Sequence, residues 1–272
     1  MKDKIISRDN ERLKSVRRIR DGKTPGTIFI EGVRLAEEVL RSTIAVNECF
    51  VSGDFANANR KTALIDEMNR RGISISEVDA NIFPSISDTA NSQGIVLIGK
   101  RPADSKAQIE KSLHDSALVI FLHEIGDPAN LGAVLRTAEA AGVAGVVISR
   151  DSADVFSSRA LRASMGSSLR VPIWEGADFS EVILWSNEHG LRTTAADVSS
   201  KIPYSQIDWL RPRLLIFGSE AHGLGGDIIE HIDEVTYIPM ENNVESLNLA
   251  VSCGVILFEA NRQRQITGYR IG

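Results

Sequence analysis

Cysteine and long apolar runs are scarce in this chain of 272 residues. Its two cysteines, Cys49 and Cys253, are too few for a disulfide framework, and no cysteine–histidine group has the spacing of a zinc site. No apolar run reaches the length of a membrane span, and the first residues contain no apolar signal segment. We therefore expect a cytoplasmic protein with reduced thiols, no bound metal and no membrane anchor.

Charged residues are unevenly distributed along the chain. The net charge of −5 argues against a protein that binds nucleic acid over its whole surface. Residues 1–24 nevertheless contain nine lysines and arginines against four acidic residues. This basic segment is either a solvated helix face or a local surface that contacts phosphate groups.

The pattern of apolar residues predicts two α/β units. Residues 1–100 alternate predicted helices (8–20, 31–41 and 62–71) with short strands, which is typical of a small α/β sandwich. Residues 101–115 are polar and charged and are the best candidate for a linker. In residues 116–272, apolar runs at 118–122, 145–149 and 214–217 alternate with helical patterns. Continuous apolar strands of this kind predict a parallel sheet that helices cover on both faces.

Two polar residues occupy the helix predicted after the strand at 118–122. Ligands of open α/β sheets bind at the carboxyl ends of strands, so the start of this helix is a candidate site. Asn130 lies at the helix entrance, where it either caps the helix or faces an anion. Arg136 lies among apolar residues, so it needs either an ion-pair partner or a functional role.

Polar residues also follow two later strands. Gly218 and Gly223 permit a tight turn around Glu220, directly after the strand at 214–217. After the strand at 235–238, Ser246 is the expected N-cap of the last helix and Asn248 falls in its first turn. Because the carboxyl ends of parallel strands meet at one sheet edge, we expect these loops to converge on a single ligand pocket.

Together these stretches resemble the motifs of the SpoU/TrmH family in the SPOUT superfamily, whose members are RNA ribose 2′-O-methyltransferases. The matching segments occur in the family's order: 130–138 (NLGAVLRTA), 157–166 (SSRALRASMG), 218–224 (GSEAHGL), 238–240 (IPM) and 246–252 (SLNLAVS). In the first unit, 29–35 (FIEGVRL) and 86–94 (ISDTANSQG) are similar to the RNA-binding domain that many members carry. That domain resembles kink-turn-binding ribosomal proteins.

The family resemblance implies more about the fold than the apolar pattern does. Members of the family have a C-terminal α/β domain with a deep trefoil knot, whereas the pattern alone predicts an unknotted, doubly wound parallel sheet. Members are also dimers in which this domain and the last helix pack together. We therefore expect an RNA-binding domain in residues 1–100, a linker in 101–115, a methyltransferase domain in 116–272, and a homodimer.

The resemblance also implies a reaction, in which S-adenosyl-L-methionine donates a methyl group to a ribose 2′-hydroxyl of structured RNA. Ribosomal RNA, the 23S molecule in particular, is a better candidate substrate than tRNA, and no metal is needed. The family assigns catalysis to Arg136, Asn130, Glu220, Ser246 and Asn248. It assigns cofactor binding to Gly218, Ile238, Met240 and Leu247.

The role of Arg136 as a base conflicts with the chemistry of its side chain. A guanidinium group has a pKa above about 12, so it accepts a proton reluctantly at neutral pH. We expect Arg136 instead to bind phosphate and to stabilise the developing alkoxide, while the proton leaves through RNA phosphate or water.

Three alternative functions differ in what they require of the sequence. A tRNA methyltransferase would use the same motifs. An RNA-binding homologue without catalysis would have no need of the catalytic motif residues, which are all present: Asn130, Arg136, Glu220 and Asn248. A hydrolase would pair Ser219 or Ser246 with His222, but the chain has no GxSxG nucleophile motif at either serine.

Overall fold

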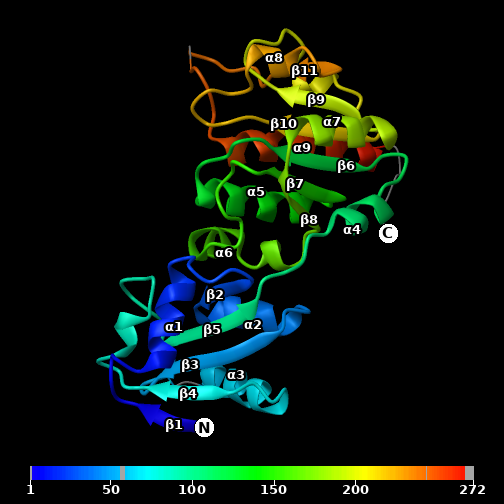
Figure 1. Cartoon of the computed structure of the whole chain (residues 1–272). Helices are drawn as coiled ribbons and strands as arrows, with labels where there is room; N and C mark the ends of the chain where they lie inside the picture. Colours follow the sequence, from blue (N-terminus) through cyan, green and yellow to red (C-terminus); the bar gives the residue numbers. More distant parts are fainter. Residues whose placement is uncertain (1, 56–58, 243, 267–272) are drawn as a thin grey trace. The chain divides into compact units, whose positions relative to one another are not determined.

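The structure, a computed structural model, describes residues 2–55, 59–242 and 244–266 and divides the chain into two compact units (Figure 1). The first unit comprises Met1–Ala103 together with Val155–Leu169, and the second comprises Asp104–Asp154 and Arg170–Gly272. The chain therefore passes between the units three times. Among the described residues, no helix combines the length and apolarity that crossing a bilayer requires.

The first unit is built on a mixed five-stranded sheet with the order β1-β4-β3-β5-β2. Its strands are β1 (Lys2–Ile5), β2 (Thr27–Glu31), β3 (Val46–Ser52), β4 (Ile75–Val78) and β5 (Ile95–Lys100). Its helices are α1 (Glu11–Arg20), α2 (Val33–Arg41), α3 (Asn59–Arg70) and α6 (Ser158–Ser164), with 3-10 turns at Phe83–Ser85 and Ser167–Leu169. Strand β1 has no counterpart in the sequence prediction, because its four residues carry too short a pattern to identify.

A buried carboxylate joins the two segments of this unit that resemble the family's RNA-binding domain. Glu31, at the end of β2, is 5% exposed and accepts hydrogen bonds from four groups of a single loop. The donors are the hydroxyl of Ser87, the backbone N–H of Asp88 (2.8 Å), and the hydroxyls of Thr89 (2.8 Å) and Ser92 (2.8 Å). A buried charge needs such partners, so Glu31 determines the conformation of residues 87–92.

Several arginines of the basic N-terminal segment bind groups within the first unit. Arg12 forms an ion pair with Glu48, Arg17 donates to the carbonyl of Arg8 (2.8 Å), and Arg20 donates to the carbonyls of Ser85 (3.2 Å) and Ser87 (3.1 Å). These side chains stabilise the unit itself. The guanidinium groups of Arg8 and Arg18 have no hydrogen-bond or ion-pair partner among the described residues, and both residues are exposed. The side chain of Lys2 lies outside the described residues.

The second unit contains the parallel sheet that the apolar pattern predicts. Its six strands have the order β11-β9-β10-β6-β7-β8, and all pairs are parallel. The strands are β6 (Leu118–Leu122), β7 (Gly145–Ser149), β8 (Ile173–Ala177), β9 (Arg192–Ala196), β10 (Arg213–Phe217) and β11 (Glu234–Thr236). The helices are α4 (Lys106–Lys111), α5 (Pro128–Ala141), α7 (Phe179–Glu188), α8 (Gly226–Ile229) and α9 (Leu249–Ile266), with a 3-10 turn at Tyr204–Gln206.

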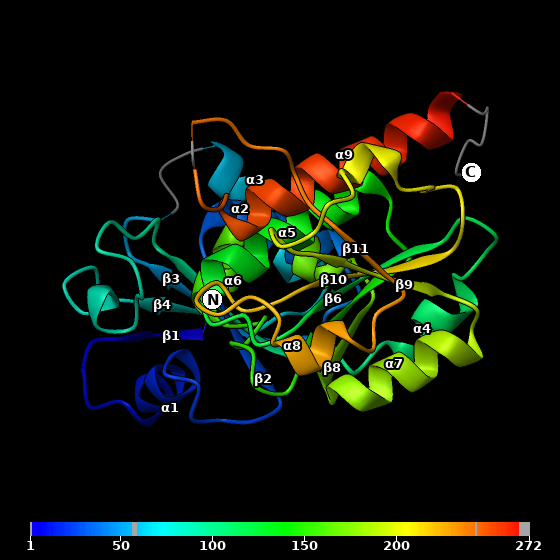
Figure 2. The ribbon, with the colours of Figure 1, turned by 90° about the horizontal axis from the view of Figure 1, so that it is seen from above.

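Helices cover both faces of this sheet. Figure 2 shows α5 and α9 on one side of the strands and α4, α7 and α8 on the other. Strands β6, β7 and β10 are buried at every position, which explains their continuous apolar sequences. The predicted linker, 101–115, contains α4, whose Ile109 is fully buried beside Gly145, where any side chain would clash with it. One apolar residue in a charged stretch is too weak a pattern to predict this helix.

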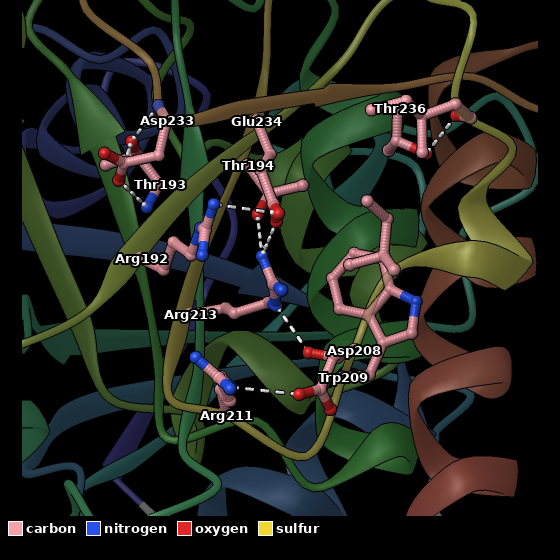
Figure 3. Close-up of polar contacts among 12 residues, drawn as sticks. Arg192, Thr193, Thr194, Asp208, Trp209, Arg211, Arg213, Asp233, Glu234 and Thr236 are labelled. Atoms are coloured by element: carbon pink, nitrogen blue, oxygen red, sulfur yellow. Dashed lines mark hydrogen bonds and ion pairs between the residues drawn. The ribbon is translucent and has the colours of Figure 1, made fainter.

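The amino ends of three strands are held by an ion-pair network around the buried Arg213 (Figure 3). Arg213, at the start of β10, is 1% exposed and forms an ion pair with Glu234 at the start of β11. Arg213 also donates to the hydroxyl of Thr194 (2.7 Å) and the carbonyl of Asp208 (2.7 Å). Arg192, at the start of β9, forms a second ion pair with Glu234 (3.0 Å). Because each buried charge has a partner, this edge of the sheet is held in one arrangement.

Strand β11 lies between β9 and the chain segment that leaves β9. On one side it pairs with β9 in parallel, with Val235 opposite Ala195. On the other side, the hydroxyl of Ser200 donates to the carbonyl of Val235 (2.6 Å), and the N–H of Tyr237 donates to the carbonyl of Ile202 (3.0 Å). The connection from β9 to β10 therefore passes around the outer side of β11.

Candidate functional site

A pocket of about 580 Å³ lies at the carboxyl ends of β9, β10 and β11 in the second unit. Of the nine predicted site residues, eight line it: Asn130, Gly218, Glu220, Ile238, Met240, Ser246, Leu247 and Asn248. Pockets of this size commonly hold small molecules and cofactors. The convergence of the loops that we expected from the sequence is therefore present.

Two helix caps explain how the polar side chains reach this pocket. The carboxylate of Asp127 accepts from the N–H of Ala129 (2.9 Å) and caps α5, so Asn130 is not the cap. The side chain of Asn248 accepts from the N–H groups of Ala250 (2.9 Å) and Val251 (3.3 Å) and caps α9. The prediction that Ser246 caps this helix was wrong, because the helix begins three residues later, at Leu249.

A chain of hydrogen bonds connects the three loops, and we call it the amide relay. Glu220 accepts from the Nδ2 of Asn130 (2.9 Å) through one carboxylate oxygen and from the N–H of Gly126 (3.2 Å) through the other. The Oδ1 of Asn130 in turn accepts from the Nδ2 of Asn248 (3.0 Å). Residues 90 and 118 positions apart in the sequence thus hold one another in a single orientation.

The loop that delivers Gly126 to the relay is itself held by two serines. The N–H of Glu124 donates to the hydroxyl of Ser149 (2.8 Å), and the N–H of Ile125 donates to the hydroxyl of Ser152 (3.0 Å). Glu124 adopts a φ of 56°, a left-handed conformation that side chains rarely occupy. Backbone strain of this kind is typical of functional sites. Beside it, burial lowers the pKa of His123, against the opposing charges of Glu124 and Asp151.

A tight turn forms the part of the pocket that follows β10. The N–H of Gly223 donates to the carbonyl of Ser219 (2.8 Å), which closes the turn over residues 219–223. A Cβ atom on Gly218 would lie 2.3 Å from the carbonyl oxygen of Gly223, closer than real contacts allow. Gly218 is therefore required by the close approach of two backbone segments.

Arg136 is the one predicted site residue that does not line the pocket. It lies six positions after Asn130 in α5, which places it about 9 Å further along the helix and about a third of a turn around it. Its side chain is exposed and has no hydrogen-bond or ion-pair partner among the described residues. The structural ion pair that was one interpretation of Arg136 is therefore absent from this part of the chain.

Other pocket residues were not identified from the sequence. Asp197 and Val198 follow β9, Tyr237 follows β11, and all three line the pocket. The rule that ligands bind after the carboxyl ends of strands would have found Asp197 had it been applied to β9. No hydrogen bond joins Ser219 or Ser246 to His222 within the described part of the chain, so the serine–histidine pair of a hydrolase is not assembled.

Comparison with known proteins identifies the family of this chain. The sequence matches the SpoU rRNA Methylase family over residues 117–258. The chain belongs to this family. A second match, to the RNA 2′-O ribose methyltransferase substrate binding family, covers residues 29–104.

The similarity of this SpoU family member to known proteins covers nearly the whole chain. An uncharacterized tRNA/rRNA methyltransferase of Synechocystis sp. is 31% identical over 96% of this chain and 94% of its own length. The 23S rRNA (guanosine(2553)-2′-O)-methyltransferase of Bacillus subtilis is 26% identical over 93% and 97%. A crystal structure of an AdoMet-bound rRNA methyltransferase from Sinorhizobium meliloti has a TM-score of 0.82 at 26% identity and covers 96% of this chain and 97% of its own.

S-adenosylmethionine is the cofactor of this family, and the pocket suits it. Its volume accommodates a nucleoside-sized ligand, and its wall combines backbone and aliphatic groups with a few polar side chains. The described residues contain no group of three histidine, cysteine or acidic side chains placed to hold a metal ion.

The turn after β10 gives a direct test of this pocket. We expect Gly218→Ala to weaken S-adenosylmethionine binding by at least about tenfold, because the added Cβ forces the turn to open. Isothermal titration calorimetry measures the change. Gly225→Ala is the matched control, since a Cβ there meets nothing within 4 Å. Equal affinities for the two variants would contradict the role of the turn.

Proposed function

We propose that this protein transfers a methyl group from S-adenosylmethionine to a ribose 2′-hydroxyl of structured RNA. The amide relay carries the proposal, because it brings the family's motifs together at the pocket that suits the cofactor. Family membership and the rRNA methyltransferases among the relatives support it. The intact relay favours an active enzyme over an RNA-binding homologue without catalysis.

The reaction requires alignment and removal of a proton. When bound, S-adenosylmethionine supplies an activated methyl group whose leaving group is a neutral thioether. The loops around the reacting atoms are held by Glu220, Asn130 and Asn248. Such rigid loops can keep the 2′-hydroxyl and the methyl group aligned, which lowers the entropic cost of the reaction. Ser246 and Asn248 line the pocket and each has a polar group that can bind the incoming ribose.

Arg136 acts on the RNA side of the reaction. Its exposed guanidinium, without a partner in the described residues, is available to bind the phosphate next to the target ribose. The same positive charge stabilises the oxygen as its proton leaves to RNA phosphate or water. Its position outside the pocket lining supports contact with RNA and not with the cofactor. Gly218, Ile238, Met240 and Leu247 hold the cofactor in this proposal.

Replacing Arg136 should lower the rate of methyl transfer without weakening cofactor binding. We expect Arg136→Ala to lower the rate of methyl transfer by at least about a hundredfold, because charge stabilisation is lost, while S-adenosylmethionine still binds. Tritium transfer to RNA measures the rate, and calorimetry measures binding. Arg211→Ala removes another exposed arginine, two residues before β10, and serves as the control. Full turnover of the Arg136 variant would remove this residue from the mechanism.

We further propose that the substrate is ribosomal RNA, with the 23S molecule as the first candidate. The relatives from Bacillus subtilis and Sinorhizobium meliloti are both rRNA methyltransferases, which supports this choice over tRNA. Residues 29–104 match a substrate-binding family, so the first unit holds the RNA, with Arg8 and Arg18 as exposed cations for phosphate. Such a substrate places the protein in the cytoplasm.

Mapping ribose methylation in cells with and without the gene tests this substrate. We expect one 2′-O-methyl position to disappear from 23S rRNA in the deletion strain and to return with the wild-type gene. The gene for the Arg136→Ala variant should not restore it. Loss of a site from tRNA, with 23S rRNA unchanged, would identify the enzyme as a tRNA methyltransferase instead.

We propose that the protein is a homodimer that forms through α9. Val251 and Phe258 are 51% and 52% exposed and lie seven residues apart, so they occupy the same side of this helix. Leu247 and Val244, just before the helix, are also exposed and apolar. An exposed row of large apolar side chains favours burial against a partner.

A charge placed in this apolar row should separate the dimer. We expect Phe258→Asp to change the mass measured by light scattering from that of two chains to that of one, because a carboxylate resists burial. Leu184→Asp is the matched control, since Leu184 is 65% exposed but lies on α7, on the other face of the sheet. A two-chain mass for the Phe258 variant would exclude this face of α9 as the interface.

We also propose that the second unit is knotted. The connection from β9 to β10 passes outside β11, so the chain that forms β11 lies within a covalent loop. From β11 the chain returns to α9, which packs against α5. This path supports the trefoil knot that the family resemblance implies.

A further inference from the structure

The charged groups around the pocket are predominantly acidic. Two carboxylates, Asp197 and Glu220, line it, and the described lining residues include no lysine or arginine. Both oxygens of Glu220 accept hydrogen bonds in the amide relay. Asp197 has no ion-pair partner among the described residues. Its negative charge is therefore not balanced by a cation of the pocket.

The side chain of Asp197 is held in place at the end of β9. Its Oδ1 accepts from the N–H of Ser199 (2.8 Å), and its own N–H donates to the carbonyl of Thr236 (2.9 Å). Its Oδ2 lies toward the turn after β10, 3.5 Å from where a Cβ on Gly223 would be. One oxygen thus anchors the side chain, and the other lies beside a turn whose residues line the pocket.

The cofactor and the product of the reaction differ by one positive charge. S-adenosylmethionine carries a sulfonium in addition to its amino-acid ammonium and carboxylate, so its net charge is +1. S-adenosylhomocysteine has lost the sulfonium and is neutral overall. A half-buried carboxylate favours a cation in the same pocket because water screens the attraction less there.

We propose that Asp197 is a specificity-determining residue that makes the pocket prefer the charged cofactor over its neutral product. This inference rests on the proposed methyltransferase function. Transfer of the methyl group removes the positive charge, so the same carboxylate that attracts the cofactor holds the product less tightly. Asp197 thereby favours replacement of product by fresh cofactor after each turnover.

The expected size of the effect follows from simple electrostatics. Two unit charges about 10 Å apart, at an effective dielectric constant of about 20, alter a binding constant by about tenfold. Glu220 contributes a second negative charge, but neutralising it would also disturb the amide relay. Asp197→Asn retains an oxygen for the N–H of Ser199, so it removes the charge and keeps the anchor.

Calorimetry with both ligands tests this role without relying on activity. The quantity measured is the ratio of the dissociation constant for S-adenosylhomocysteine to that for S-adenosylmethionine. We expect this ratio to fall about tenfold in Asp197→Asn and to be retained in Asp197→Glu. Sinefungin, which carries a protonated amine in place of the sulfonium, should lose affinity in parallel with S-adenosylmethionine. Asp227→Asn removes an equal charge from α8, outside the pocket lining, and should leave the ratio unchanged.

Two results would overturn the proposal. If both ligands weaken equally, Asp197 binds a group that they share, such as the ribose hydroxyls or the ammonium, and does not discriminate by charge. If the ratio stays constant with both affinities unchanged, Asp197 has no role in binding. Thermal unfolding of each variant checks that the fold is retained. Failure of the wild-type protein to bind S-adenosylmethionine would instead contradict the proposed function, so the two failures are distinguishable.

Discussion

The hydrogen-bonded chain through Gly126, Glu220, Asn130 and Asn248 sets the geometry on which the site depends. A carboxamide has one acceptor end and one donor end, so each link determines the orientation of the next. Glu220 orients Asn130, Asn130 orients Asn248, and the Oδ1 of Asn248 then caps α9. The start of the last helix and the turn after β10 are therefore coupled, and disturbing one link affects all three loops.

The two ends of the parallel sheet serve different purposes. At the amino ends of β9, β10 and β11, buried Arg213 and its partner Glu234 hold the strands in one arrangement. At the carboxyl ends, the same strands present the loops that line a pocket with two carboxylates, and the neighbouring strand β6 leads into the strained residue Glu124. Because the amino ends of these strands are held rigidly by ion pairs, the carboxyl ends can carry polar side chains that are free to bind a ligand.

The first unit depends on a comparable use of buried charge. Glu31 arranges the loop at residues 87–92, and Arg17 and Arg20 of α1 donate to nearby carbonyls. Residues 155–169 lie between two segments of the second unit in the sequence, but their contacts place them in the first unit. Among them, Arg162 of α6 forms an ion pair with Asp88 (2.7 Å) in the loop that Glu31 arranges. The RNA-binding unit that we propose is therefore built from two separate parts of the chain.

By itself, the sequence determined the parallel sheet of the second unit and nine candidate site residues, eight of which line the pocket. Apolar runs and turn residues are local patterns, and the loops after parallel strands must meet at one edge. Only the tertiary structure decided that Asp127 and Asn248 are the caps, that α4 occupies the predicted linker, and that Asp197 enters the pocket. Several side chains near each of these positions could have taken the same role, and contacts with residues distant in the sequence decide which one does. Such contacts leave no local pattern in the sequence.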